Sequence, residues 1–224
     1  MWEKRRLSLA TLALIPAGPT AFNTNLLKPE ELTSYKDLLK PQLKGKIVVF
    51  DPTIAGQSWV PLANRLMGED YLRELVKQDV LITRDIRLMD EWIVRGKYPL
   101  GLGVDPGGVR TMIKDGAPIS ILPPFKEGVD LGPAGGNVAV IDKNAHPNAT
   151  RVFVNWILGK EGQTILTREL GIASRRIDVP TGHLASPWMV PDPKIKYIVH
   201  DEDYSRYKLQ MMEVAKTIFA PVLK

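Results

Sequence analysis

The sequence predicts an α/β fold, with mostly parallel strands flanked by helices on both faces of a sheet. Short apolar runs rich in valine, isoleucine and leucine recur along residues 46–122. Between them lie stretches with apolar residues at helical spacing, and glycine or proline closes most of these stretches. Parallel strands need crossover connections of this kind, so the alternation favours a parallel sheet.

Residues 46–122 are interpreted as four strands and four helices. The strands are expected at residues 46–50, 80–82, 98–104 and 119–122. The helices are expected around residues 59–66, 71–76, 88–93 and 109–113. Asp85, Asp90 and Glu91 share a helix with arginines, and we interpret them as part of a solvated charged face.

After residue 122 the sequence pattern changes. Residues 125–136 are rich in glycine and proline and predict a segment that crosses between lobes. Residues 137–141 predict a strand, and Pro147 opens a helix with Val152, Phe153, Trp156 and Ile157 on one face. A companion helix ends at Gly171. We expect a last helix, over residues 207–218, to pack on a lobe as a lid or brace.

The composition excludes several classes of protein. The chain has 224 residues, 44% hydrophobic and 25% charged, without repeats, which disfavours disorder and solenoids. The net charge of +5 is scattered rather than clustered, so we expect no nucleic-acid partner but regard an anionic ligand as compatible. The absence of cysteine excludes disulfides and thiolate metal sites.

The N-terminal region has two interpretations. Basic residues at positions 4–6 and the apolar run 7–15 imitate a secretory signal with cleavage after Ala21. The same run, followed by Pro16, Gly18 and Pro19, is also typical of a buried strand before a turn. No other segment approaches the roughly 18 apolar residues of a membrane span.

The sequence contains no complete motif of an enzyme active site. The histidines at 146, 183 and 200 lack metal-site spacing and carboxylate partners. Gly101 and Gly103 lie in a strand pattern without the third glycine of a dinucleotide-binding loop. We therefore predict no catalytic residues, no metal site and no cofactor.

Two long ordered motifs resemble a known family. The first comprises residues 23–32, 34–39 and 45–47, with Asp51, Pro52, Thr53 and Gly56. The second comprises residues 146–149 and 155–163. Together they are similar to the periplasmic iron(III)-type solute-binding proteins of ABC importers, over about residues 22–178.

This resemblance implies a periplasmic-binding-protein-like fold of two lobes with mostly parallel sheets, the first lobe being incomplete. Residues 1–27 would be a remnant of lobe 1 and the first hinge strand, 28–123 a complete lobe 2, and 124–224 the second crossing and the C-terminal part of lobe 1. In such proteins on the order of one hundred residues of βα units precede the first crossing, where this chain has 22, so truncation is the preferred interpretation over a signal on a one-lobe binder.

The resemblance also implies a function. Such a protein captures a small anionic or polar solute by hinge closure, does no chemistry on it and presents it to an ABC permease. It would act in the periplasm or another extracytoplasmic compartment, as a monomer, with its signal region missing from this chain.

Candidate ligand-binding residues lie mainly at strand ends. The loop Thr53, Ile54, Ala55, Gly56, Gln57, Ser58 joins a strand to a helix, where free backbone N–H groups attract anions, although an ordinary helix cap explains it about equally well. Asp105 and Gly107 occupy a second such loop, or a tight turn. Asn23 on the first crossing completes the set with an arginine, Arg175 or alternatively Arg84, Arg110 or Arg176.

Two alternatives remain open. A ferric-iron binder of this family would carry adjacent tyrosines, whereas Pro106, Gly107 and Gly108 stand in the corresponding place and the six tyrosines are dispersed. An enzyme of the same fold, such as a thiamine-precursor synthase, would require a histidine-rich reactive site.

Overall fold

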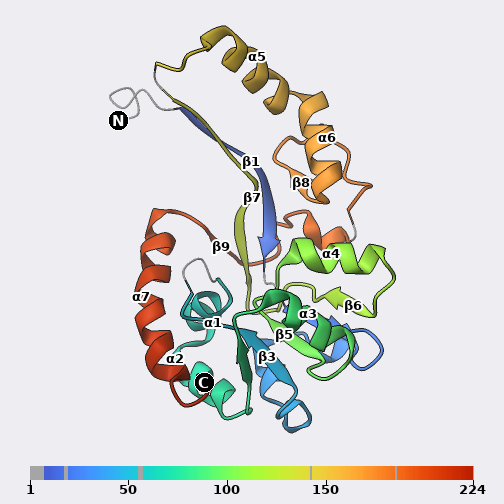
Figure 1. Cartoon of the computed structure of the whole chain (residues 1–224), viewed down its shortest axis with the longest axis vertical. Helices are drawn as coiled ribbons and strands as arrows, with labels where there is room; N and C mark the ends of the chain where they lie inside the picture. The colour runs from blue at the N-terminus through green and yellow to red at the C-terminus, as the bar shows by residue number, and fades with distance from the viewer. Residues whose placement is uncertain (1–7, 18–19, 55–57, 142, 185, 224) are drawn as a thin grey trace. The chain divides into compact units, whose positions relative to one another are not determined.

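The computed structural model describes residues 8–17, 20–54, 58–141, 143–184 and 186–223. Two compact units divide the chain (Figure 1). Unit 1 comprises Met1–Pro16 and Leu131–Pro193, and unit 2 comprises Ala17–Asp130 and Lys194–Lys224. In the part of the chain that is described, no helix is long and apolar enough to cross a membrane.

Unit 2 is built on a five-stranded sheet of order β4-β3-β5-β2-β6. Its strands are β2 (Thr20–Asn23), β3 (Ile47–Phe50), β4 (Leu81–Thr83), β5 (Leu100–Leu102) and β6 (Ile119–Ile121). β3 pairs in parallel with both β4 and β5, whereas β2 runs antiparallel to β5 and β6. The expectation that residues 46–50 and 98–104 share one sheet is confirmed.

Helices cover both faces of this sheet. They are α1 (Trp59–Met67), α2 (Glu69–Val76), α3 (Ile86–Val94) and α4 (Pro106–Lys114), with three short 3-10 helices at Pro29–Glu31, Tyr35–Leu39 and Pro41–Leu43. Ile47 and Val49 belong to the hydrophobic cluster that contains Trp59, whereas Val48 belongs to the cluster that contains Met89. Since successive side chains of a strand point to opposite faces, β3 is buried on both sides, as its uninterrupted apolar sequence predicts.

The last helix, α7 (Glu202–Phe219), belongs to unit 2 and lies beside α1 and α2 (Figure 1). Met211, Ala215, Ile218 and Phe219 are buried in the same cluster as Trp59. The expected division, with all of 124–224 in the other lobe, differs from this grouping. The reason is tertiary: the apolar side of α7 completes the core of unit 2.

One long strand replaces the predicted irregular crossing, and another occupies the apolar run near the N-terminus. β7 (Val129–Val140) includes much of the glycine-rich crossing, and the division between the units falls within it, after Asp130. β1 (Ser8–Ala17) is the apolar run near the N-terminus, so the strand interpretation of that run is confirmed. These strands form a second sheet, of order β8-β1-β7-β9, with β8 (Ala173–Ser174) and β9 (Tyr197–Val199).

Unit 1 contains two packed helices, α5 (Pro147–Leu158) and α6 (Lys160–Leu170), and the 3-10 helix Pro187–Met189. A Cβ at Gly162 would lie 2.2 Å from the carbonyl oxygen of Trp156, so only glycine permits this close approach. Gln163 Nε2 donates to the Ile157 carbonyl at 2.8 Å. α6 therefore covers the side of α5 that carries Ile157.

The position of α7 leads to a stability prediction. Phe219→Ala removes a fully buried ring from the unit 2 core, and we expect the free energy of unfolding to fall by about 3–5 kcal/mol. Leu209→Ala is the matched control, because Leu209 lies on the same helix but is 64% exposed, and we expect a change below about 0.5 kcal/mol. Denaturant titration compares the two. If the two variants unfold with the same free energy, the assignment of α7 to this core is contradicted.

Candidate functional site

Three loops leave the sheet of unit 2 at one edge. Because β3, β4 and β5 run in the same direction, their carboxyl ends lie together, with Phe50 opposite Thr83 in the register. Asp51, Arg84 and Asp105 follow these strand ends in the sequence. Ligands of open α/β sheets bind outside such an edge, so we take it as the candidate site.

A buried carboxylate organises the loop after β3. Asp51 is only 1% exposed. Its Oδ1 accepts from the Thr53 backbone N–H at 2.8 Å and from Thr53 Oγ1 at 2.6 Å. Its Oδ2 accepts from Arg84 Nε at 2.6 Å. Burial by itself would raise the pKa of Asp51, but the hydrogen bonds from Thr53 and Arg84 outweigh it and hold the pKa below its ordinary value.

Asp51 thereby directs Arg84 towards solvent. The Arg84 side chain is 75% exposed, and its bond to Asp51 uses Nε. A guanidinium anchored through Nε keeps its two terminal nitrogens in a fixed plane for a bidentate contact with a carboxylate or phosphate. The sequence suggested Arg84 only as one of several arginines. Its partner Asp51 was not identified as an anchor.

The start of α1 lies in the same loop. Ser58 occupies the N-cap position, but its side chain makes no capping hydrogen bond. Pro61 carries no N–H, and the Leu62 N–H bonds to the Ser58 carbonyl. Within the part of the loop that the structure describes, the Ser58 hydroxyl is therefore not used to cap α1. Ala55, Gly56 and Gln57, expected to complete this cradle, lie outside the described residues.

The loop after β5 is an ordinary capped helix start. The Asp105 carboxylate accepts from the Gly107 N–H at 3.2 Å and from the Gly108 N–H at 2.8 Å. The Val109 N–H bonds to the Asp105 carbonyl. These bonds use the amides that an anion would need, so Asp105 and Gly107 act as a cap and turn. The structure therefore favours the tight-turn interpretation of this loop over the ligand-binding one.

Asn23 lies away from this edge. It ends β2, which is antiparallel to β5, and its backbone N–H bonds to the carbonyl of Pro99, just before β5 begins. The side chain is 2% exposed, and Nδ2 donates to the carbonyls of Ile93 and Val94 at 2.8 and 2.9 Å. The prediction that Asn23 contacts the ligand together with Thr53 is therefore corrected, because Asn23 fastens the C-terminal end of α3.

The other arginines differ in their surroundings. Arg175 is exposed and belongs to unit 1, whereas the loops described above belong to unit 2. Its neighbour Arg176 is paired with Asp178, through two bonds of 2.9 Å. Arg110 is half-buried, and burial lowers its pKa. Arg84 is thus the arginine with a structural anchor at the candidate edge.

Asp90 corrects a second expectation. It is 3% exposed rather than solvated, and its Oδ1 has no hydrogen-bond partner among the described residues. Burial, followed by the charge of Asp105, raises its pKa to about 6. The sequence contained a signal: Asp90 adjoins Met89 and precedes Ile93 by three residues, which places it on the buried stripe of α3.

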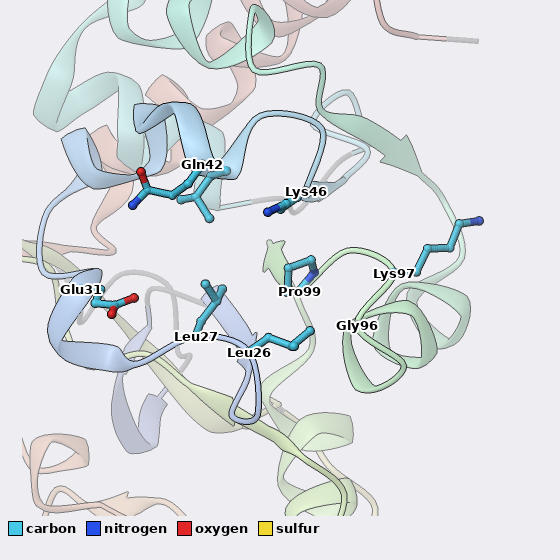
Figure 2. A pocket seen from close by; sticks show the side chains of 9 residues that line it. Leu26, Leu27, Glu31, Gln42, Lys46, Gly96, Lys97 and Pro99 are labelled. Atoms are coloured by element: carbon cyan, nitrogen blue, oxygen red, sulfur yellow. The ribbon is translucent and has the colours of Figure 1, made fainter.

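A cavity of about 390 Å³ opens at the opposite edge of the sheet (Figure 2). Figure 2 shows the Lys46 ammonium pointing into it, whereas Lys97 points away. The Lys97 ammonium lies 4.9 Å from the centre of the Trp92 ring. Since this cavity lies where β3 and β5 begin, it is separate from the candidate edge. Another cavity, of about 520 Å³, lies beside α7 and is lined by Arg65, Tyr204 and Tyr207.

Comparison with known proteins identifies the family. Residues 9–169 match the model of the bacterial extracellular solute-binding proteins. The chain belongs to this family. An uncharacterised protein of Haemophilus influenzae is 29% identical over 174 residues, which are 75% of this chain and 48% of that relative. The chain therefore spans about half the length of the curated relative that it matches.

Solved structures of solute-binding proteins share the fold. A substrate-binding protein of an Agrobacterium tumefaciens ABC transporter matches 94% of this chain and 67% of its own, with TM-score 0.68 and 14% identity. The Actinobacillus pleuropneumoniae protein AfuA, with fructose 6-phosphate bound, matches 95% and 67%, with TM-score 0.60 and 24% identity. A Bordetella ferric binding protein matches 94% and 69%, with TM-score 0.65 and 18% identity. The expected periplasmic-binding-protein-like α/β fold is confirmed.

The buried charge of Asp90 leads to a pH prediction. Its folded pKa of about 6 exceeds the ordinary 3.8, so its contribution to stability is complete below pH 3.8 and lost as the pH rises through 6. The shift corresponds to roughly 3 kcal/mol, which solvent screening reduces. We expect Asp90→Asn to stabilise the protein by about 1–2 kcal/mol at pH 8 and by less at pH 5.

Chemical unfolding at the two pH values measures this difference. Glu91→Gln, at an exposed neighbouring position on α3, should show no such gain. An Asp90→Asn variant that is less stable than the parent at pH 8 would show that the ionised carboxylate has a stabilising partner.

Proposed function

We propose that the protein is the solute-binding component of an ABC importer and captures a small anionic or polar solute at the carboxyl edge of the unit 2 sheet. Hinge closure between the two lobes would retain the solute, and the closed form would be presented to a membrane permease. The family supports an extracytoplasmic site of action. The incomplete first lobe belongs to the same proposal, with its C-terminal part limited to residues 131–193 instead of the expected 124–224.

The observation that carries the proposal is the bond between Asp51 and Arg84. A buried carboxylate holds an exposed guanidinium beside the loop that leads into α1. The positive end of the α1 dipole and the Ser58 hydroxyl favour negative charge at the same place. Among the structural neighbours, AfuA is described with fructose 6-phosphate bound, which supports a phosphorylated or carboxylated solute here.

Ferric iron is the less favoured ligand. The structure does bring dispersed tyrosines together in two pairs. The Tyr204 and Tyr207 rings stack with centroids 5.9 Å apart, and the Tyr35 and Tyr71 rings meet edge-on at 6.0 Å inside the unit 2 core, where burial raises the pKa of both phenols. Burial likewise raises the pKa of Tyr204 and Tyr207. Ferric iron prefers ionised oxygen ligands, so neutral buried phenols make a weak site.

An enzymatic alternative also finds little support. The expectation that the histidines lack carboxylate partners is wrong for His200, whose Nε2 lies 2.5 Å from the Asp130 carboxylate, beside Tyr204. His183 contacts the Ile172 carbonyl. These two histidines contact different segments, so they do not form the histidine-rich reactive site that a thiamine-precursor synthase would require. The family and the neighbours described above are named as binding proteins.

The role of Arg84 is tested with fructose 6-phosphate and inorganic phosphate as probes. We expect Arg84→Ala to weaken binding at least tenfold, because it removes a charge-assisted contact worth about 1.5–3 kcal/mol. Arg87→Ala, which removes another exposed charge, from α3, should change the affinity less than twofold. Isothermal titration calorimetry measures both. Similar losses in the two variants would indicate a general charge effect and not a site.

The loop itself is tested by Gly56→Val and Ser58→Ala. A branched side chain at position 56 should block access and abolish binding, whereas loss of the hydroxyl should cost on the order of 1 kcal/mol. Thermal unfolding controls for strain in the turn. If the Gly56→Val protein is stable and binds the phosphate probes with unchanged affinity, the loop only caps a helix and does not bind the ligand.

For iron, we expect no visible charge-transfer band when ferric citrate is added at neutral pH, because the buried phenols stay protonated. Absorption spectroscopy provides the measurement. A band that disappears in Tyr204→Phe or Tyr207→Phe would contradict this expectation.

A further inference from the structure

The cavity at the edge where β3 and β5 begin has the size of a small-molecule site (Figure 2). Its volume of about 390 Å³ falls within the range of small-ligand pockets, and the residues that line it belong to unit 2. We call it the amino-edge cavity. Its lining includes Leu26, Leu27, Glu31, Lys46, Gly96 and Pro99. The candidate edge for the solute lies at the other end of the same strands, so the two places are distinct.

Asn23 fixes one wall of the amino-edge cavity. Its Nδ2 donates to two carbonyls at the C-terminal end of α3, at 2.8 and 2.9 Å. Its own carbonyl accepts from the backbone N–H groups of Leu26 and Leu27, at 3.2 and 3.0 Å. A Cβ at Gly96 would lie 2.6 Å from Leu26 Cδ1, so the glycine makes room for this leucine. The wall is therefore in place before a ligand binds, which lowers the cost of binding.

The cavity also offers apolar surface to a ligand. Leu26 is 56% exposed, although it is a large apolar side chain. Leu27 packs on the core of unit 2 but stays partly accessible, and Leu43 and Pro99 are buried behind it. An aliphatic chain that covers Leu26 and Leu27 removes apolar surface from water, which favours binding.

Two side chains of opposite charge line the cavity without an ion pair between them. The Lys46 ammonium points into it, and Glu31 lines it from the end of the 3-10 helix Pro29–Glu31 (Figure 2). Among the residues that the structure describes, neither side chain has a hydrogen-bond or ion-pair partner. The nearby Lys44, by contrast, pairs with Asp79 at 3.4 Å. Both charges of the cavity are therefore available to a ligand.

These charges indicate the chemical class of the ligand. A molecule with a single charge is attracted by one of the two side chains and repelled by the other. A molecule with a carboxylate at one end and an ammonium at the other is attracted by both, and its aliphatic middle lies on Leu26 and Leu27.

We propose that the amino-edge cavity binds an ω-amino carboxylic acid, with its carboxylate at Lys46 and its ammonium at Glu31. This is a second small-molecule site of the protein. It does not involve the Arg84 site, so either can fail while the other stands.

The first experiment compares ligands by isothermal titration calorimetry of the whole chain. The probes 6-aminohexanoate, hexanoate and hexylamine share an aliphatic chain and differ in their charged ends. We expect 6-aminohexanoate to bind at least fivefold more tightly than the other two, because it alone meets both charges. Equally tight binding of hexanoate or hexylamine would overturn the proposal. So would the absence of saturable binding for 5-aminopentanoate, 6-aminohexanoate and 8-aminooctanoate.

The second experiment assigns the two ends of the ligand. Lys46→Met and Glu31→Gln should each weaken the binding of 6-aminohexanoate at least fivefold. Its advantage over hexylamine should disappear in Lys46→Met, and its advantage over hexanoate in Glu31→Gln. Lys97→Met is the matched control, because Lys97 lines the cavity but points away from it, and it should change the affinity less than twofold.

Thermal unfolding checks these variants, and it should be unchanged because all three residues are exposed. Equal losses of affinity in the three variants would indicate a general charge effect and overturn the proposal. Advantages that persist in both Lys46→Met and Glu31→Gln would overturn it as well.

Two-dimensional NMR locates the bound ligand. With 6-aminohexanoate added stepwise, we expect saturable shifts of the Leu26, Leu27 and Gly96 amide signals, while those of Thr53 and Ser58 stay unchanged. Shifts confined to Thr53 and Ser58 would place the ligand at the candidate solute site and contradict a second site.

Discussion

The buried Asp51 carboxylate is the group on which the candidate site depends. It follows β3, which has parallel partners on both sides, so its position is set by the sheet. From there it bonds the backbone and hydroxyl of Thr53 and anchors Arg84 from the end of the neighbouring strand. An unpaired buried carboxylate would be costly, and these partners compensate it. The same bonds fix the guanidinium of an otherwise exposed arginine, which is the feature behind the proposed anion contact.

Much of unit 2 could be predicted from the sequence, because its signals are local. Apolar runs such as 47–50, separated by helical spacing and glycine, led to the correct strands and helices. The features that were missed depend on tertiary context. β7 is a strand despite its glycines because neighbouring strands pair with it, and α7 joins unit 2 because its apolar side completes that core.

The candidate site was only partly predictable, for related reasons. Parallel strands indicated which edge to take as the candidate site, and this edge stays a prediction. Strand direction decides which residues lie there, and antiparallel β2 places Asn23 at the opposite edge. Capping cannot be distinguished from ligand binding by residue type. The Asp105 carboxylate accepts hydrogen bonds from amides at the start of α4, whereas the Ser58 side chain makes no capping hydrogen bond to α1. The pairing of Asp51 with Arg84 joins residues 33 positions apart, beyond the reach of any local pattern.

The central claim is that an anion binds at the edge where Asp51 orients Arg84. Two-dimensional NMR of the protein, with fructose 6-phosphate added stepwise, tests this claim most directly. We expect saturable shifts of the Arg84 Nε–H signal and of the Thr53 and Ser58 amides, with the Lys46 and Gly96 signals at the opposite edge unchanged. Shifts confined to Lys46 and Gly96, or no saturable shift for any phosphate or carboxylate probe, would contradict it.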